Sequence, residues 1–578
     1  MRHYYIILLV FIVHTFCISC NYLPAQAETK DIVEELTVEH IYDSASIWVD
    51  SVYSSLSEEQ KIAQLFWLAV EQPYGSTSFE TIKSLVERYQ PGGILLFKMT
   101  PQEADLTIDT LQSISKVPLF VSIDAEWGLG MRITGATNFP YAMTLGAIRN
   151  DSLVYQMGFE IARQLRSLGI NVNMAPVADI NSNPDNPVIG IRSFGELTAN
   201  VASKSLAYMK GLQDGGVMAV GKHFPGHGDT SSDSHKTMPI VSHSATLLDT
   251  TDLVPFKAMI EAGLWGVMTA HIGLPALDSR KGIPASFSDS IVKNLLKDNL
   301  GFRGLVITDA LNMQGAKTMG TPGIVDALAL AAGNDIVEFT EDINAGIRAV
   351  QSAIEDSIIS LYDVEDKCRR SLSFKYWLTQ HHTQIEVDKT KLDSILNISD
   401  TSELNQQLYD AALTVLINDS ILPVNEEQND ISCIILGNAP LIAAEMEKQG
   451  KNVYILPTSN DLVFDRVLEG VEPSNAYIFI IADSQWGRRR INSSRREQLI
   501  HLACNTPTIS VFMGNPYHLS SWRSLEKSSA LVLSYQNSIQ AQQSVIRLLN
   551  GEIGANGRLP VSIRNWFEAG RGEIVIKK

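Results

Sequence analysis

The sequence predicts an α/β protein, a (β/α)8 TIM barrel followed by a smaller α/β sandwich domain. Two observations predict the barrel. Between about residues 60 and 340, eight short apolar runs alternate with segments whose apolar residues recur at helical spacing. Polar residues stand at the ends of several runs, as they do where the parallel strands of a barrel open into an active site. An open doubly wound sheet is the alternative arrangement of such units.

The predicted strands of the barrel are short and apolar, as expected for strands buried on both faces. They are residues 62–69, 93–97, 119–124, 172–177, 218–223, 266–271, 305–309 and 335–338. The clearest predicted helices between them are residues 151–168, 198–213, 245–261 and 289–300. These eight units place the barrel at residues 45–376.

A second alternation of strands and helices follows a polar stretch at residues 377–402, which we expect to be a linker. We expect the second domain at residues 403–578. Its predicted strands are residues 431–436, 452–456, 477–482, 508–513 and 530–534, and its clearest predicted helices are residues 495–504 and 538–550.

Composition agrees with a globular protein of two or three domains. The chain has 578 residues, of which 45% are hydrophobic and 19% charged. The formal net charge of -18 argues against a nucleic-acid partner, because a polyanion is repelled by a field of the same sign.

The N-terminus predicts export. Arg2 precedes an apolar run at residues 5–16, which is the length of a signal-peptide core and too short to span a bilayer. The run ends at a sequence resembling a lipoprotein signal-peptidase site, with Cys20 as the lipidated residue. We therefore expect a signal peptide at residues 1–19, a tether at residues 20–44 and a membrane-anchored lipoprotein in the periplasm or on the cell surface. Plain secretion is the alternative.

The other cysteines are scattered and do not suggest a disulfide framework. Cys368, Cys433 and Cys504 have apolar neighbours, so we expect buried thiols without a catalytic role.

The loop at residues 222–235 carries three histidines, two aspartates and a lysine, and it follows the apolar run at residues 217–220. Such a loop suits proton transfer, since imidazole titrates near neutral pH and a neighbouring carboxylate orients the ring. Two plainer interpretations are a solvated polar loop and a metal site. The metal site would use His223, His227, Asp229 and His235. We expect no metal and no organic cofactor.

The string from Lys222 to His235 resembles the signature loop of glycoside hydrolase family 3, in the bacterial β-N-acetylglucosaminidase branch. Similar segments lie, in the family's order, at residues 124–128 with Arg132, 175–179, 186–195 and 307–311. The resemblance covers most of residues 45–380. The departure is Glu126-Trp127, where the family more often has Glu-Gly, and Trp127 either stacks on a sugar or packs internally.

The resemblance implies roles for individual residues. Asp309 would be the nucleophile, and His235 with Asp233 beside it would be the acid/base pair. Asp124, Arg132, Arg192, Lys222 and His223 would hold the hydroxyls of the sugar in the first subsite. His271 ends a predicted strand, so it joins the substrate-binding candidates, although it could equally be a core histidine. An ionised carboxylate at Asp309 suits attack on an anomeric carbon with retention of configuration.

The function expected from these residues is that of an exo-acting retaining β-N-acetylglucosaminidase. Its substrate would be a carbohydrate, either peptidoglycan fragments or similar glycans with terminal β-linked N-acetylhexosamine. The alternatives are a β-N-acetylglucosaminide phosphorylase that uses the same two groups, a β-glucosidase with its acid/base in the second domain, and a sugar-binding surface lipoprotein without activity.

Overall fold

The computed structural model describes residues 37–578 except 73, 233–237, 382–387, 425–429, 459, 483–497, 500 and 502–505. Several predictions lie outside the described residues: the signal peptide, Cys20, most of the tether, the Asp233–His235 pair, Cys504 and nearly all of the helix expected at residues 495–504. Among the residues that are described, no helix has both the length and the apolar character needed to cross a membrane.

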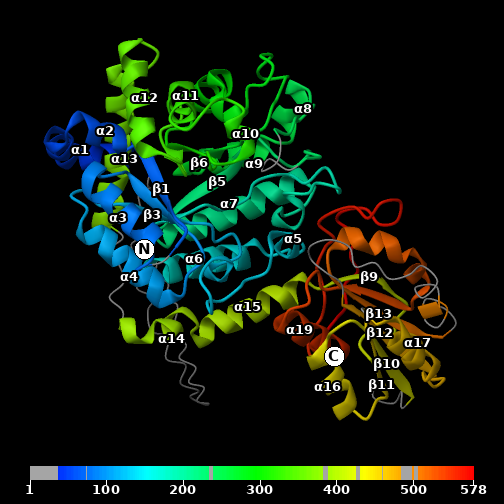
Figure 1. Cartoon of the computed structure of the whole chain (residues 1–578). Helices are drawn as coiled ribbons and strands as arrows, with labels where there is room; N and C mark the ends of the chain where they lie inside the picture. The colour runs from blue at the N-terminus through cyan, green and yellow to red at the C-terminus, as the bar shows by residue number, and fades with distance from the viewer. Residues whose placement is uncertain are drawn as a thin grey trace, which may run out of the picture. The chain divides into compact units, whose positions relative to one another are not determined.

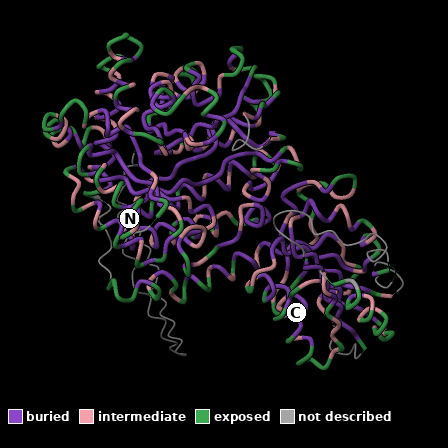
Figure 2. The backbone as a smooth tube through the Cα atoms, viewed as in Figure 1, coloured by how far each residue is buried: buried purple, intermediate pink, exposed green. Residues whose placement is uncertain are grey.

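The predicted barrel is confirmed. Eight parallel strands follow one another in the order β7-β6-β5-β4-β3-β2-β1-β8, and a parallel bridge between Ile307 and Ile336 brings the two ends of the sheet together. Figure 1 shows strands of this sheet with helices around them. The strands are β1 Phe66–Val70, β2 Gly93–Leu96, β3 Phe120–Ile123, β4 Val172–Asn173, β5 Met218–Phe224, β6 Gly266–Thr269, β7 Leu305–Thr308 and β8 Val337–Glu338. Their residues are buried almost without exception, which explains their continuous apolar runs (Figure 2).

The two largest differences between the predicted and observed strand limits have local reasons. The first strand begins at Phe66 because Ile62 and Ala63 belong to α2 Glu58–Ala63. That helix starts with a capping box between Ser57 and Gln60, which commits the apolar residues after it to a helix. The fourth strand has only two residues, since cis-Pro176 follows closely and cannot donate to a sheet.

Helices surround the strands of the barrel. They are α3 Thr77–Tyr89, α4 Pro101–Ser113, α5 Ala142–Leu145, α6 Asp151–Ser167, α7 Thr198–Asp214, α8 Ala245–Thr250, α9 Val254–Glu261, α10 Gln314–Lys317, α11 Ile324–Ala332 and α12 Ile343–Glu355. A π-helix, η4 Ser290–Asn299, occupies the predicted 289–300 segment. The segment predicted as one helix at 245–261 is divided in two, and Pro255 stands in the first turn of the second helix, where it needs no N–H partner.

Further helices precede the first strand of the barrel or follow its last helix in the sequence. α1 Val38–Ser55 packs against α13 Leu361–His381, with the rings of His40 and Trp377 meeting edge to face at 5.7 Å. α14 Leu392–Leu396 and α15 Ser399–Ala412 follow.

The predicted second α/β domain is confirmed as a six-stranded mixed sheet. Its strand order is β11-β10-β12-β13-β14-β9, with β9 antiparallel to β14. The strands are β9 Thr414–Asn418, β10 Ile431–Leu436, β11 Val453–Leu456, β12 Ala476–Ala482, β13 Thr508–Met513 and β14 Ala530–Leu533. The helices include α16 Pro440–Lys448, α17 Asp461–Glu469, η6 Pro516–Lys527 and α19 Ile539–Leu549. The prediction lacked β9, although its Thr-Val-Leu-Ile run is typical of a strand.

Candidate active site

A cavity of about 440 Å³ opens where the carboxyl ends of the barrel strands converge. That volume is within the usual range for small-molecule sites. Charged side chains gather in its wall beside apolar ones. Its lining residues are Glu71, Leu95, Phe97, Asp124, Glu126, Met131, Arg132, Val188, Arg192, Lys222, His223, His227, Met268, Asp309, Ala310, Asn312, Met313, Glu338 and Phe339. The described residues of the second domain contribute none of these side chains.

Asp124 follows β3 and accepts from two cations. Arg132 Nη2 lies 2.6 Å from Asp124 Oδ2, and Lys222 Nζ lies 2.8 Å from Oδ1. Burial alone would raise the pKa of the Asp124 carboxyl, but the charges of Lys222 and Arg132 outweigh burial and hold it well below its ordinary value. Asp124 is therefore an ionised acceptor on the cavity wall.

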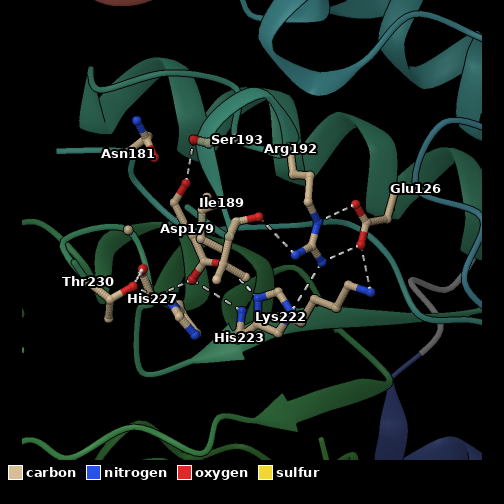
Figure 3. Close-up of polar contacts among 12 residues, drawn as sticks. Glu126, Asp179, Asn181, Ile189, Arg192, Ser193, Lys222, His223, His227 and Thr230 are labelled. Carbon is tan, nitrogen blue, oxygen red and sulfur yellow. Dashed lines mark hydrogen bonds and ion pairs between the residues drawn. The ribbon is translucent and has the colours of Figure 1, made fainter. Parts of the chain in front are cut away.

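Glu126 forms a second ion-pair group with Arg192 and Lys222 (Figure 3). Arg192 donates from Nε and Nη2 to the two oxygens of Glu126 at 2.9 and 2.6 Å, a bidentate arrangement, while Lys222 Nζ lies 2.9 Å from Oε1. Glu126 is 8% exposed and Lys222 is 2% exposed. Lys222 thus links Asp124 to Glu126. The cations Arg132, Arg192 and Lys222 each have a carboxylate partner.

His223 is oriented from behind by Asp179. Its Nδ1 lies 2.7 Å from Asp179 Oδ2, and its Nε2 lies 3.5 Å from Arg192 on the cavity side (Figure 3). The other Asp179 oxygen accepts the backbone N–H of His227 at 2.7 Å. Burial lowers the pKa of His227 to about 4, so this ring is neutral near pH 7, and Thr230 lies 2.8 Å from its Nδ1.

Asp309 is the first residue after β7, and its carboxylate oxygen Oδ1 accepts the N–H of Ala310 at 2.8 Å. Burial would raise the pKa of the Asp309 carboxyl, but His223 and His271 oppose this effect. The Ala310 amide and Lys222 also lower the pKa. Together these groups outweigh burial, so the pKa of Asp309 lies below its ordinary value. Asp309 is therefore ionised, as a carboxylate nucleophile must be.

His271 does not occupy the position expected of a substrate-binding residue. Its ring is fully buried and does not line the cavity. Nδ1 lies 2.7 Å from Ser286 Oγ and Nε2 lies 3.2 Å from the Ala310 carbonyl oxygen, and burial lowers its pKa. This geometry favours the alternative of a core histidine that supports the chain beside Asp309, and contact between His271 and the sugar stays a prediction.

The structure brings together Asp124, Arg132, Arg192, Lys222, His223 and Asp309 in one cavity wall. Trp127 lies outside the lining and meets Tyr141 edge to face at 4.8 Å, which favours the packing interpretation. Asp229 pairs with His243 at 3.1 Å. The part of the chain that is described holds no group of three or more side chains arranged to bind a metal.

Sequence reasoning missed three residues of the site: Glu126, Asp179 and Glu338. Glu126 and Asp179 stand in segments that carried the family resemblance, which was a usable signal. Glu338 ends β8. The rule that strand ends face the active site would have found it, since the same rule selected Asp124 and Asp309.

We expect Glu126→Gln to destabilise the protein near neutral pH and to have less effect in acid. Arg192 and Lys222 overcome the effect of burial and lower the pKa of Glu126 from 4.5 to about 2. The stabilisation from this ionised group is therefore complete above about pH 4.5 and is lost as the pH falls toward 2. Removing one partner of a buried ion pair costs about 3–5 kcal/mol.

Urea unfolding of the wild type and Glu126→Gln at pH 7, 5 and 3 tests this expectation. The difference in unfolding free energy should shrink between pH 5 and pH 3. Glu58→Gln is the matched control, because the Glu58 side chain is 74% exposed and its ion pair with Lys61 contributes little. An equal difference at all three pH values would contradict the assignment.

Comparison with known proteins identifies the family of the chain. The sequence profile described as "Glycosyl hydrolase family 3 N terminal domain" matches residues 57–374. A protein named beta-hexosaminidase A, from Pseudoalteromonas piscicida, is 33% identical over 418 residues, covering 66% of this chain and 69% of its own length. A Cellulomonas fimi protein named beta-N-acetylglucosaminidase/beta-glucosidase is 30% identical over 396 residues, covering 67% of this chain and 69% of its own.

Solved structures share the fold over most of the chain. A glycoside hydrolase family 3 beta-N-acetylglucosaminidase from Paenibacillus sp. str. FPU-7 superposes with a TM-score of 0.74 at 27% identity, covering 87% of this chain and 98% of that one. A beta-glucoside phosphorylase superposes with a TM-score of 0.77 at 21% identity, covering 91% and 97%, which shows the shared fold alone. The cavity at the strand ends therefore lies within the matched domain, and the chain belongs to glycoside hydrolase family 3.

Proposed function

We propose that the protein is an exo-acting retaining β-N-acetylglucosaminidase that hydrolyses terminal β-linked N-acetylhexosamine. The observation that carries the proposal is an ionised carboxylate, Asp309, in the wall of a cavity lined by paired charges. Charged groups recognise hydroxyls strongly, because a missing hydroxyl leaves a buried charge without its partner. A single cavity of about 440 Å³ suits a terminal sugar with part of its leaving group.

The proposed reaction has two displacements. An Asp309 oxygen bonds to the anomeric carbon while the bond from that carbon to the leaving oxygen breaks, and His235 gives its proton to that oxygen. Water then attacks the same carbon, the bond to Asp309 breaks, and His235 takes the proton from water. Asp233 would orient the imidazole and favour its protonated form. The sugar leaves with its original configuration because it has been inverted twice.

Hydrolysis is favoured over phosphorolysis by the charges of the cavity. Phosphate needs cations whose charge is not already compensated. Arg132, Arg192 and Lys222 are each bound to Asp124, Glu126 or both. Phosphate would also approach the ionised Asp309 against its charge, whereas water is neutral.

An N-acetylglucosaminide is favoured over a glucoside by two observations. The two relatives described above are named beta-hexosaminidase A and beta-N-acetylglucosaminidase/beta-glucosidase. No described residue after Phe339 lines the cavity, so a β-glucosidase acid/base from the second domain has no counterpart among the described residues.

A product assay tests the proposal. The enzyme should cleave an aryl β-N-acetylglucosaminide with a kcat/KM at least about tenfold above that for the aryl β-glucoside, which corresponds to about 1.4 kcal/mol of transition-state binding. In phosphate buffer the product should be free N-acetylglucosamine. A dominant sugar 1-phosphate would establish phosphorolysis instead, and a preference for the glucoside would establish a β-glucosidase.

We also propose that the enzyme is exported and anchored through lipidated Cys20, where it would act on peptidoglycan fragments or similar glycans. The support is the apolar run ending at that cysteine in the sequence. Mass spectrometry of the mature protein should find acyl groups on Cys20, and an unmodified mature N-terminus would refute the anchor.

A further inference from the structure

Glu338 is a buried carboxyl group in the cavity wall that the proposed mechanism does not use. It is the last residue of β8, pairs in register with Trp67 of β1, and lies on the strand beside β7, which Asp309 follows. Its side chain lines the cavity while the residue is only 2% exposed. The oxygen Oε1 is buried and has no hydrogen-bond partner among the described residues. Buried polar atoms of this kind normally have partners, and a bound ligand would supply the one that is missing here.

The carboxyl of Glu338 differs from its neighbours in charge. Asp124 and Glu126 have cation partners, and Asp309 accepts a backbone N–H. Among the described residues, Glu338 makes no ion pair. Burial raises its pKa, the negative Asp124 and Asp309 raise it further, and Lys222 and Arg132 oppose them without prevailing. Glu338 therefore keeps its proton to higher pH than the ionised carboxylates Asp124, Glu126 and Asp309 beside it.

The backbone around Glu338 is held in a costly conformation. Phe339 has φ of 54°, in the left-handed region that bulky side chains rarely adopt. Its ring packs edge to face on Phe97 at 5.7 Å, and its N–H donates to the Trp67 carbonyl oxygen at 3.1 Å. The Glu338 N–H donates to Thr308 Oγ1 at 3.0 Å. Such strain persists where the surroundings impose it, typically at functional sites, and these contacts fix the direction of Glu338.

Sugar hydroxyls explain why a neutral acid is useful here. Each hydroxyl both donates and accepts, whereas Asp124 and Asp309 as carboxylates only accept. A neutral carboxyl offers one O–H donor and one acceptor oxygen. We propose that Glu338 binds a hydroxyl of the sugar held against Asp309, donating its own proton in that hydrogen bond. This inference rests on the proposed glycosidase function and adds a substrate-binding residue to it.

Three variants test the proposal with an aryl β-N-acetylglucosaminide. Glu338→Ala should lower kcat/KM about tenfold or more, the cost of leaving a sugar hydroxyl unpaired. Glu338→Gln should recover most of this loss, because its amide is neutral and can both donate and accept. Asp326→Asn is the matched control: Asp326 is also a buried carboxyl with an unpartnered oxygen, and its pKa is raised to about 6, but it lies on α11 and not in the cavity lining. It should change the melting temperature and leave KM near that of the wild type.

The pH dependence provides a second readout. A carboxyl with a raised pKa is neutral at low pH and ionises as the pH rises, which would remove its donor and place a charge near Asp309. The ratio of kcat/KM between wild type and Glu338→Gln should therefore fall as the pH rises. Other titrating groups are common to both proteins and cancel in the ratio.

Deoxy substrates locate the contact. For one of the 3-, 4- and 6-deoxy sugars, wild type and Glu338→Ala should have equal kcat/KM, because the hydroxyl that Glu338 binds is already missing. Equal losses on all deoxy sugars, or unchanged kinetics in Glu338→Ala with only a lower melting temperature, would overturn the proposal. A loss that grows steeply with leaving-group pKa would overturn it too, since Glu338 would then be a proton donor. An inactive wild type would refute the proposed function itself, which separates the two failures.

Discussion

Asp309→Asn should reduce kcat by at least about a thousandfold while the fold is preserved, because an amide replaces a carboxylate of the same shape and the loss falls on the transition state. The surroundings of Asp309 prepare its carboxylate for attack. Its oxygen Oδ1 already accepts the Ala310 N–H at 2.8 Å, and the surrounding groups lower its pKa, so the carboxylate is ionised and fixed before substrate arrives. Such preorganisation costs nothing at the moment of reaction.

Trapping the intermediate checks the assignment directly. A fluorinated sugar with a good leaving group slows both displacements by destabilising the oxocarbenium-like state, and its second displacement can be slow enough for a glycosyl-enzyme to accumulate. Mass spectrometry should then find the sugar on the peptide containing Asp309. The Asn variant should show no adduct and should still unfold in one cooperative transition. A near-normal kcat in that variant, or an adduct on another carboxylate such as Glu338, would refute the role.

Strand ends were the part of the site that the sequence predicted well. Asp124 and Asp309 follow apolar runs directly, and Lys222 and His223 lie near the end of one, so the geometry of a parallel barrel was sufficient to expect them at one face. The barrel and the parallel part of the second sheet were predictable for the same reason. Fully buried strands leave an unmistakable apolar pattern.

Partnerships between side chains were not predictable from the same pattern. Glu126 was not among the predicted site residues, yet its carboxylate binds both Arg192 and Lys222. His271 looked like a site residue, yet its ring faces Ser286 and the chain beside Asp309. Which way a side chain turns at a strand end depends on contacts between residues far apart in sequence. Local periodicity does not contain that information.

The ionisation states of the cavity side chains bear on which residue transfers the proton. The pKa values of Asp124, Glu126 and Asp309 are lowered, so these carboxylates are ionised near neutral pH. Without a bound proton, none of them can act as the general acid. The cavity histidine His227 has a pKa of about 4 and is neutral. The resemblance to glycoside hydrolase family 3 implies that the proton is transferred by His235 with Asp233 beside it, on the loop that continues after residue 232, while we propose that Glu338 binds the sugar.

His235→Ala should therefore slow substrates with poor leaving groups far more than activated ones. An alkyl or sugar leaving group needs a proton as its bond breaks, so its first displacement should fall by about 10²–10⁴-fold. A dinitrophenyl group leaves without a proton, so its first displacement should change little. Release of the sugar then becomes slow, since water also loses its base, and a burst of dinitrophenol should precede the steady state.

Stopped-flow and steady-state kinetics with a series of aryl leaving groups measure both effects. The logarithm of kcat/KM should fall steeply with leaving-group pKa in His235→Ala and only weakly in the wild type. An added anion such as azide should restore turnover of the dinitrophenyl substrate, because it attacks the glycosyl-enzyme without giving up a proton. The matched control is His243→Ala, whose histidine pairs with Asp229 and Asp252 and does not line the cavity. Equal losses for all leaving groups, without an azide effect, would show that His235 positions the sugar and that another residue transfers the proton.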